Sequence, residues 1–339
     1  MSSEVWQRRL ERLWYRDTAP PLLRPLSRLF AGLQALRRHA YRAGWLQRES
    51  IAAPVVVVGN LVVGGSGKTP VVLALAEHCR AAGWRPGIVS RGHGARDNRR
   101  PRLVTPDDDA AQVGDEPLLL ARRSGVPVCI GRDRAAAARR LLAQGVDLVL
   151  ADDGLQHYRL ARDVEIVVID GERRFGNGWL LPAGPLREPL TRLAEADLVL
   201  VNGPAGGEAG FELLPVAWQR LGDGRRVEPE AFAGQAALAL AGIGNPARFF
   251  ASLRRLQIRA QPLPLPDHGR IEPRRLERPA GMPLLMTEKD AVKYLEDNLQ
   301  NTWYLIVKTE FNDLAKQALA RLFDDLRPAA AGALEQPAT

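Results

Sequence analysis

The chain has 339 residues and a mass of 37.2 kDa, which is enough for two domains. Its 46% hydrophobic and 25% charged residues exclude disordered and fibrous proteins, and its two cysteines, Cys79 and Cys129, exclude a disulfide-stapled fold. The sequence has neither a leader-peptide pattern nor an apolar run long enough to cross a bilayer, so we expect a cytosolic protein.

The net charge of +8 is concentrated near the N-terminus. Residues 1–50 hold ten arginines and four acids, which accounts for six of the eight net positive charges. Only five of the 47 basic residues are lysines, and Lys68 is the only lysine before residue 289. Because an ammonium is a compact point charge and a guanidinium a planar fork, this lysine indicates a position that arginine would not serve.

The first predicted element is a helix over residues 22–42, whose leucines recur at three- and four-residue spacing on one face. Arginines occupy the opposite face, and aromatic residues flank the segment. This combination is typical of a helix lying in a membrane surface, and we interpret residues 1–48 as a basic amphipathic arm that binds one. A helix that only packs on the body is the alternative. Nucleic-acid binding is not expected, because no recognised binding signature accompanies the arginines.

A phosphate-binding loop is predicted next. Residues 54–59 read PVVVVG, a pattern for a buried strand, and a glycine-rich turn leads from them into a helix. Strand, turn, Gly-Lys-Thr and helix are the elements of a P-loop, in which Lys68 would reach the β- and γ-phosphates and Thr69 would bind Mg²⁺. The first glycine of the usual G-x-x-x-x-G-K-[ST] pattern is replaced by Val62. The predicted phosphate-binding residues are Val62, Val63, Gly64, Gly65, Ser66, Gly67, Lys68 and Thr69.

Two acidic pairs follow. Asp115 and Glu116 lie in a Gly-Asp-Glu-Pro turn, where an aspartate can equally be a helix N-cap. Asp152 and Asp153 end an apolar strand, at the edge where open parallel sheets bind ligands, and this placement predicts a Mg²⁺ site. The [NT]-K-x-D loop with which GTPases read guanine has no match, since Thr287–Asp290 has its lysine one place late. ATP is therefore the expected nucleotide.

The element pattern predicts an α/β protein of the P-loop NTPase type, with a mainly parallel sheet and helices on both faces over residues 49–210. Residues 211–230 are interpreted as a β-ribbon linker and residues 231–327 as a smaller second α/β lobe. The Ala/Pro-rich residues 328–339 are expected to be disordered. The strands of the first unit are predicted near 55–58, 87–90, 127–130, 147–151, 165–169 and 197–201.

The sequence resembles the tetraacyldisaccharide 4′-kinase family of the lipid A pathway over nearly its whole length. Each shared motif is weak alone, but their order and joint presence are specific. The valine at position 62 is a trait of that family, whereas His93 stands where a tyrosine is usual and Gly269 where a second histidine is common. In chain order the motifs are VGNLVVGGSGKTP (58–70), SRGHG (90–94), GDEP (114–117), GRDR (131–134), DDGLQH (152–157), PAGPLREP (182–189), PDH (266–268) and TEKDAVK (287–293).

The resemblance implies a lipid kinase that uses ATP and Mg²⁺. Its acceptor would be the 4′-hydroxyl of a tetraacylated glucosamine disaccharide 1-phosphate. The protein would bind peripherally to the cytoplasmic face of the inner membrane. A substrate that stays in the bilayer fits the basic arm, because each arginine near an anionic surface contributes about 1 kcal/mol to binding.

The resemblance also implies roles for single residues. Asp115 would be the base, and His268 of the second lobe would orient it or share the proton. Arg187, with Arg132 and Arg134 as alternatives, would neutralise the γ-phosphate. The predicted catalytic residues are Asp115, His268, Lys68 and Arg187, and the predicted Mg²⁺ ligands are Thr69, Glu116, Asp152, Asp153 and Glu188.

Two other functions stay open at this point. A P-loop enzyme acting on a soluble acid or a small alcohol would not need the basic arm. A P-loop ATPase or metal-insertion chaperone would hydrolyse ATP without a lipid acceptor.

Overall fold

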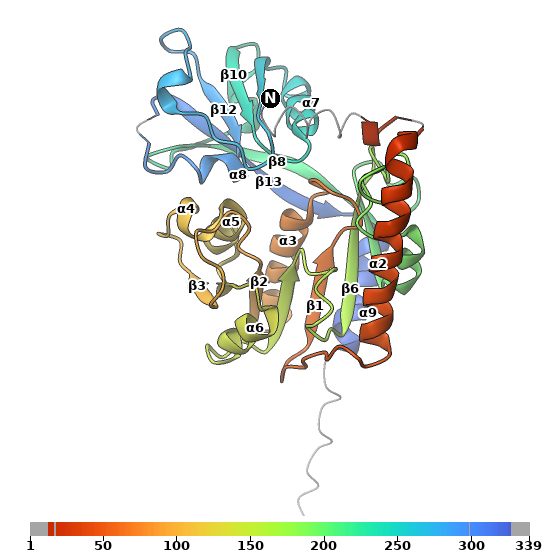
Figure 1. Ribbon diagram of the computed structural model, residues 1–339. Coiled ribbons are helices and arrows are strands. Elements are labelled where there is room, and N and C mark those ends of the chain that lie inside the picture. The colour runs from red at the N-terminus through yellow and green to blue at the C-terminus, as the bar shows by residue number, and fades with distance from the viewer. Residues whose placement is uncertain (1–12, 17, 298, 327–339) are drawn as a thin grey trace, which may run out of the picture.

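A computed structural model describes residues 13–16, 18–297 and 299–326, so the tail 328–339 and residues 1–12 of the arm lie outside the described residues. Thirteen strands within these ranges form one mainly parallel sheet with helices on both faces, which confirms the predicted fold class. The sheet continues through two lobes (Figure 1). Its strand order is β11-β10-β12-β13-β8-β7-β6-β1-β5-β2-β4-β3, and β9 pairs with β8.

The first lobe is built around β1, whose valines are fully buried because helices cover both faces of the sheet. All strands of this lobe are parallel except β3, which runs antiparallel to β4. Their bounds are β1 (Val55–Gly59), β2 (Pro86–Ser90), β3 (Arg102–Val104), β4 (Val128–Ile130), β5 (Leu148–Asp152), β6 (Val164–Asp170) and β7 (Leu198–Asn202).

Each face of this sheet has its own hydrophobic core. Helices α3 (Lys68–Ala81), α5 (Asp115–Ser124) and α9 (Asp313–Asp325) contribute Leu75, Leu118 and Leu319 to one core. Helix α6 (Arg134–Leu142) contributes Leu141 to the other. The shorter elements of this lobe are α4 (Ala110–Val113) and the 3₁₀ turn η2 (Leu190–Glu195), and those of the second lobe include the 3₁₀ turns η3 (Pro229–Phe232) and η4 (Pro273–Arg275).

The second lobe is joined to the first by a long antiparallel strand pair. β8 (Gly210–Arg220) pairs along its length with β13 (Thr302–Phe311), whereas β9 (Arg226–Val227) pairs with only two of its residues. β13 returns the chain to the first lobe, where α9 packs. The other elements of this lobe are β10 (Ala236–Ala241), β11 (Arg259–Pro264), β12 (Leu284–Thr287), α7 (Pro246–Arg255) and α8 (Glu288–Ala291).

Helix α2 (Arg24–Arg42), preceded by the 3₁₀ turn η1 (Pro21–Leu23), lies along one side of the first lobe (Figure 1). Only Ser27 and Ala40 of this helix are buried. The leucines of this segment point away from the body: Leu22 of η1 and Leu26, Leu29, Leu33 and Leu36 of α2 are 53–90% exposed. No helix in the described ranges is both long and apolar enough to span a membrane.

Candidate active site

The glycine-rich loop connects β1 to α3. Gly64 and Gly67 have φ values of 105° and 99°, which residues with a side chain rarely adopt, and Gly67 is the N-cap of α3. Lys68 therefore opens the helix at its positive end. Val62 replaces the usual first glycine without strain, because its backbone forms a β-bridge to Leu186 and its side chain is buried.

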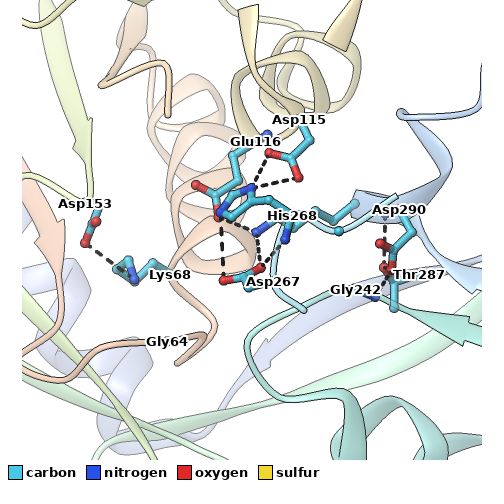
Figure 2. Close-up of polar contacts among 12 residues, drawn as sticks. Gly64, Lys68, Asp115, Glu116, Asp153, Gly242, Asp267, His268, Thr287 and Asp290 are labelled. Carbon is cyan, nitrogen blue, oxygen red and sulfur yellow. Dashed lines mark hydrogen bonds and ion pairs between the residues drawn. The ribbon is translucent and has the colours of Figure 1, made fainter. Parts of the chain in front are cut away.

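Lys68 faces the end of β5. Its Nζ atom lies 3.5 Å from Oδ1 of Asp153 (Figure 2). Nη1 of Arg187 lies 3.2 Å from both oxygens of the same carboxylate. Burial raises the pKa of Asp153, but these two cations outweigh it and hold the pKa well below the usual range. The structure thus brings together three of the residues predicted for the nucleotide site.

Asp152 differs from its neighbour. It is 1% exposed, and neither carboxylate oxygen has a hydrogen-bond partner among the described residues. Burial, followed by the nearby charges of Glu116 and Asp153, raises its pKa to about 7. A buried, unpartnered carboxylate beside two others is an unfavourable arrangement that a cation would relieve.

A second cluster forms where α5 meets the second lobe. Asp115, the first residue of α5, is 6% exposed, and its carboxylate oxygens lie 2.8 and 3.0 Å from Nδ1 of His268 (Figure 2). Burial raises the pKa of Asp115, but the hydrogen bond to His268 and the nearby lysines lower it to about 2. For His268 burial lowers the pKa, and the bond to Asp115 raises it above its ordinary value. The ring of His93 packs against that of His268, with centroids 4.7 Å apart.

Lys289 links this cluster to the neighbouring acid. Its Nζ atom donates hydrogen bonds to Glu116 across the lobes at 2.8 Å and to Asp267 at 3.0 Å. Burial lowers the pKa of Lys289, but the carboxylates around it raise it well above the usual range. Glu116 is therefore held by a permanent cation in this state of the protein.

The loop that carries His268 is held in place by Asp290 and Lys293. Asp290 is fully buried and accepts hydrogen bonds from the Gly242 N–H at 3.0 Å and from Lys293 at 2.7 Å. Lys293 in turn donates to the Gly269 carbonyl at 3.0 Å. Because His268 itself has a φ of 62°, this support fixes a backbone conformation that histidine adopts only at some strain.

A cleft with a volume of about 600 Å³ lies between the lobes. This volume suits a nucleotide with part of a second substrate. The first lobe contributes Lys68, Thr69 and Glu116 to its lining, and the second contributes Asn245, Arg248 and Lys289.

A sequence model of LpxK, described as tetraacyldisaccharide-1-P 4′-kinase, matches residues 19–325. The chain belongs to this kinase family. Relatives named tetraacyldisaccharide 4′-kinase from Alkalilimnicola ehrlichii and Azotobacter vinelandii are 49% and 50% identical. These alignments cover 91% and 93% of this chain and 95% and 97% of the relatives.

The structure is similar to a crystal structure of LpxK from Aquifex aeolicus in complex with ATP. The TM-score is 0.73 and the sequences are 27% identical, over 89% of this chain and 97% of that one. Fold and sequence thus place the chain among the tetraacyldisaccharide 4′-kinases, and the residues of its cleft can be considered as those of a kinase.

Three further predicted residues lie in different surroundings. Glu188 is fully buried and accepts a hydrogen bond from the Tyr158 hydroxyl at 2.8 Å, with Arg192 3.4 Å away. These contacts hold one side of its carboxylate, whereas Oε2 has no hydrogen-bond partner among the described residues, so its role as a metal ligand stays a prediction. Arg132 is exposed, whereas Arg134 is 3% exposed. Burial lowers the pKa of Arg134, and the nearby carboxylates of Asp152 and Asp153 oppose this lowering.

Sequence reasoning missed several polar residues that position this kinase's loop. Asn202, at the end of β7, donates to the Ser66 carbonyl at 2.8 Å. Arg173 donates to the carbonyls of Gly65 and Gly244 at 2.7 and 2.9 Å, and Asp170 holds Arg173 at 3.2 Å. A signal existed, since Asn202 and Asp170 each end an apolar strand at the ligand-binding edge of the sheet.

Proposed function

We propose that this protein transfers the γ-phosphate of ATP to the 4′-hydroxyl of a tetraacylated glucosamine disaccharide 1-phosphate. The observation that carries the proposal is one interlobe cleft. It is lined by Lys68 and Thr69 of a P-loop and by Glu116, which is adjacent to the Asp115–His268 pair that joins the lobes. Phosphoryl transfer requires a phosphate cradle and a base within reach of each other, and closure of the two lobes supplies both.

The Asp115–His268 pair is the proposed base. A carboxylate with a pKa near 2 is by itself a weak base at neutral pH, whereas an imidazole with a raised pKa titrates close to the working range. Asp115 would accept the hydrogen bond of the attacking hydroxyl, and the pair would share the proton. Because the two residues come from different lobes, the base is complete only when the cleft is closed.

Lys68 and Arg187 would neutralise charge on the phosphates, and Asp153 would keep both cations oriented toward the loop. Mg²⁺ fits the same place, where the carboxylate of Asp152 has no hydrogen-bond partner within the described ranges and Thr69 lies in the first turn of α3. No group of three or more acidic, histidine or cysteine side chains in the described part of the chain forms a metal cage of its own. Mg²⁺ commonly takes one or two carboxylates and completes its shell with phosphates, and here it would add charge neutralisation. Its proposed protein ligands are Thr69, Asp152, Asp153 and Glu116.

The exposed leucines of α2 support a membrane partner. Four leucines of α2, with Leu22 of η1, form an exposed apolar patch whose hydration is unfavourable, and arginines lie on the other side of the helix. We therefore assign this face to the cytoplasmic surface of the inner membrane, where the protein would bind peripherally and meet its lipid substrate. No nucleic-acid partner is proposed.

One assay tests the function. The protein is incubated with γ-labelled ATP, Mg²⁺ and the disaccharide lipid in mixed micelles, and the lipid is then extracted. Label on the lipid at its 4′ position is the expected result. Release of labelled phosphate at an equal rate with and without lipid would instead support the ATPase alternative.

A further inference from the structure

The segment 176–187, which we call the strap, lies between α2 and the glycine-rich loop. It ends in Arg187, the residue that binds Asp153. It has no regular helix or long strand, so its position depends on what it contacts on either side.

On one side the strap is bonded to the phosphate-binding loop. The Val63 N–H donates to the Pro185 carbonyl at 2.9 Å, and the Arg187 N–H donates to the Leu61 carbonyl at 2.6 Å. Between these bonds, Val62 and Leu186 form an antiparallel bridge. The backbone of the loop and that of the strap are therefore one small sheet, and neither can shift along the other without breaking it.

On the other side the strap is bonded to the N-terminal segment. Ser27 of α2 is 2% exposed, and its hydroxyl donates to the Leu180 carbonyl at 2.7 Å. Trp14 is 7% exposed; its indole N–H donates to the Pro182 carbonyl at 2.9 Å. The Trp14 carbonyl accepts from the Asn177 N–H at 2.8 Å. These are buried side chains bonded to backbone groups, which makes them costly to remove.

The strap itself is tightly folded, so a displacement at one side reaches the other. The Leu181 N–H donates to the Leu186 carbonyl at 2.8 Å, and the Asn177 side chain donates to the Ala183 carbonyl at 2.9 Å. A Cβ atom on Gly184 would lie 2.2 Å from Oδ1 of Asn177 and 2.3 Å from the Trp179 carbonyl oxygen. Packing of this density transmits a shift instead of absorbing it.

We propose that Ser27 and Trp14 are positioning residues for phosphoryl transfer, which act through the strap on Arg187 and the glycine-rich loop. The N-terminal segment thereby sets the geometry of the nucleotide site in addition to contacting the membrane. The membrane part of this statement rests on the proposed function. The positioning part rests only on the hydrogen bonds that join Trp14 and Ser27 to the strap and the strap to the loop.

The test is a double-mutant cycle on nucleotide binding, which separates positioning from general stabilisation. Binding of the non-hydrolysable analogue AMP-PNP with Mg²⁺ is measured by calorimetry on the full chain, on Ser27→Ala, on Arg187→Ala and on the double variant. We expect Ser27→Ala to weaken binding roughly 3- to 10-fold in the native background, and less than about 2-fold once Arg187 is absent. Trp14→Phe, which keeps the ring but loses the donor, should behave in the same way.

A matched control loosens α2 at its other end. Glu195→Gln weakens the ion pairs with Arg38 and Arg42, far along the helix from Ser27, and should leave AMP-PNP affinity within about 2-fold in both backgrounds. Equal losses for Ser27→Ala with and without Arg187 would overturn the proposal, and so would native affinity in both Ser27→Ala and Trp14→Phe. The cycle is then repeated on lipid phosphorylation. Coupling in AMP-PNP binding without any labelled lipid would retain the strap and reject the kinase proposal.

Discussion

Lys68 begins a helix after a loop with two left-handed glycines, Gly64 and Gly67, and its ammonium lies 3.5 Å from Asp153. We expect Lys68→Ala to lower turnover at least ~100-fold, because it removes a charge aimed at the phosphates. The fold should survive, since the lysine makes one ion pair at 3.5 Å. Lys68→Arg should fail as well, because a planar fork does not replace a point charge in a tight loop. Steady-state kinetics with circular dichroism as the folding control measures both, and near-native turnover in folded Lys68→Ala would contradict the assignment.

Asp115 and His268 should behave as one group. Asp115→Ala and His268→Ala should each lower kcat strongly, and the double variant should be scarcely worse than the poorer single one. The active form of the base is unprotonated. Since the pKa of His268 is raised, kcat should fall as the pH drops through a value above the ordinary histidine pKa of about 6.5. In His268→Ala this acidic limb should flatten. If the kcat losses of the two single variants are additive, or if His268→Ala keeps the acidic limb of the pH–kcat profile, Asp115 and His268 do not act as one group.

Asp152 is expected to lower the stability of the folded protein although the activity requires it. Its folded pKa of about 7 lies above the unfolded value, so it destabilises the protein as the pH rises from about 4 through 7. Asp152→Asn should therefore raise the thermal midpoint at pH 8 without Mg²⁺ by about 2 °C or more, and by less at pH 4.5. The same variant should lose activity. Calorimetric scans at the two pH values decide the matter, and a lower midpoint at pH 8 would show that the ionised carboxylate has a partner.

The residues that could be predicted share a local signal. Lys68 and Thr69 sit in a contiguous motif, and Asp152 ends an apolar strand, so sequence periodicity alone locates them. Glu188 could not be placed that way, because it lies in an irregular segment where adjacent side chains point to different partners. Its neighbour Arg187 reaches Asp153, while Glu188 turns to Tyr158 and Arg192.

At the scale of elements, α2 presents its leucines to solvent and fixes the strap with its buried side. Replacing Leu26, Leu29 and Leu33 by glutamine should weaken binding to anionic vesicles at least ~10-fold, because each leucine contributes about 1.5–3 kcal/mol when it is buried in the bilayer interface. AMP-PNP affinity should not change, since all three side chains are more than half exposed and the strap is held by Ser27 and Trp14. Vesicle sedimentation measures the membrane binding, and calorimetry measures the AMP-PNP affinity. Undiminished vesicle binding would mean that α2 only packs on the body.

Deleting residues 1–45 is a less informative experiment than the sequence suggests. The amphipathic pattern alone predicts that the N-terminal arm can be deleted with little change in ATP affinity. The structure shows that Trp14 and Ser27 are bonded to the strap, so the deletion would disturb the nucleotide site and the membrane contact together. Helical periodicity reveals which side of α2 is apolar, but it does not reveal which backbone carbonyls a buried serine reaches.

At the scale of the whole molecule, the two lobes are joined by strands distant in sequence. The element pattern could predict a parallel sheet followed by a second α/β unit, because buried strands and amphipathic helices have local periodicities. It could not predict that β8 pairs with β13, about 90 residues away, or that α9 packs on the first lobe. Those contacts depend on register and chain return, for which a single sequence has no local signal.

The lobes also meet at the phosphate-binding loop, where the backbone of Gly244 packs directly against that of Gly65. A Cβ atom on Gly244 of the second lobe would lie 2.0 Å from the Gly65 nitrogen and 2.7 Å from its Cα atom. Arg173 closes the same contact by donating to the carbonyls of both glycines. Glycine at position 244 is therefore what allows the second lobe to approach the loop.

Gly244→Ala should hold the lobes apart. Because Asp115 and His268 belong to different lobes, even a shift of about 1 Å would spoil the base, and we expect kcat for lipid phosphorylation to fall ~100-fold. The thermal midpoint should change less than kcat, because the substitution adds a methyl group at the surface of contact between the lobes and removes no buried side chain. Gly32→Ala is the matched control, since the added methyl group meets nothing within 4 Å and native kcat is expected. Native kcat in Gly244→Ala would mean that catalysis does not require the close approach of the turn to the loop, and the base would then have to be sought within the first lobe, at Asp152 or Asp153.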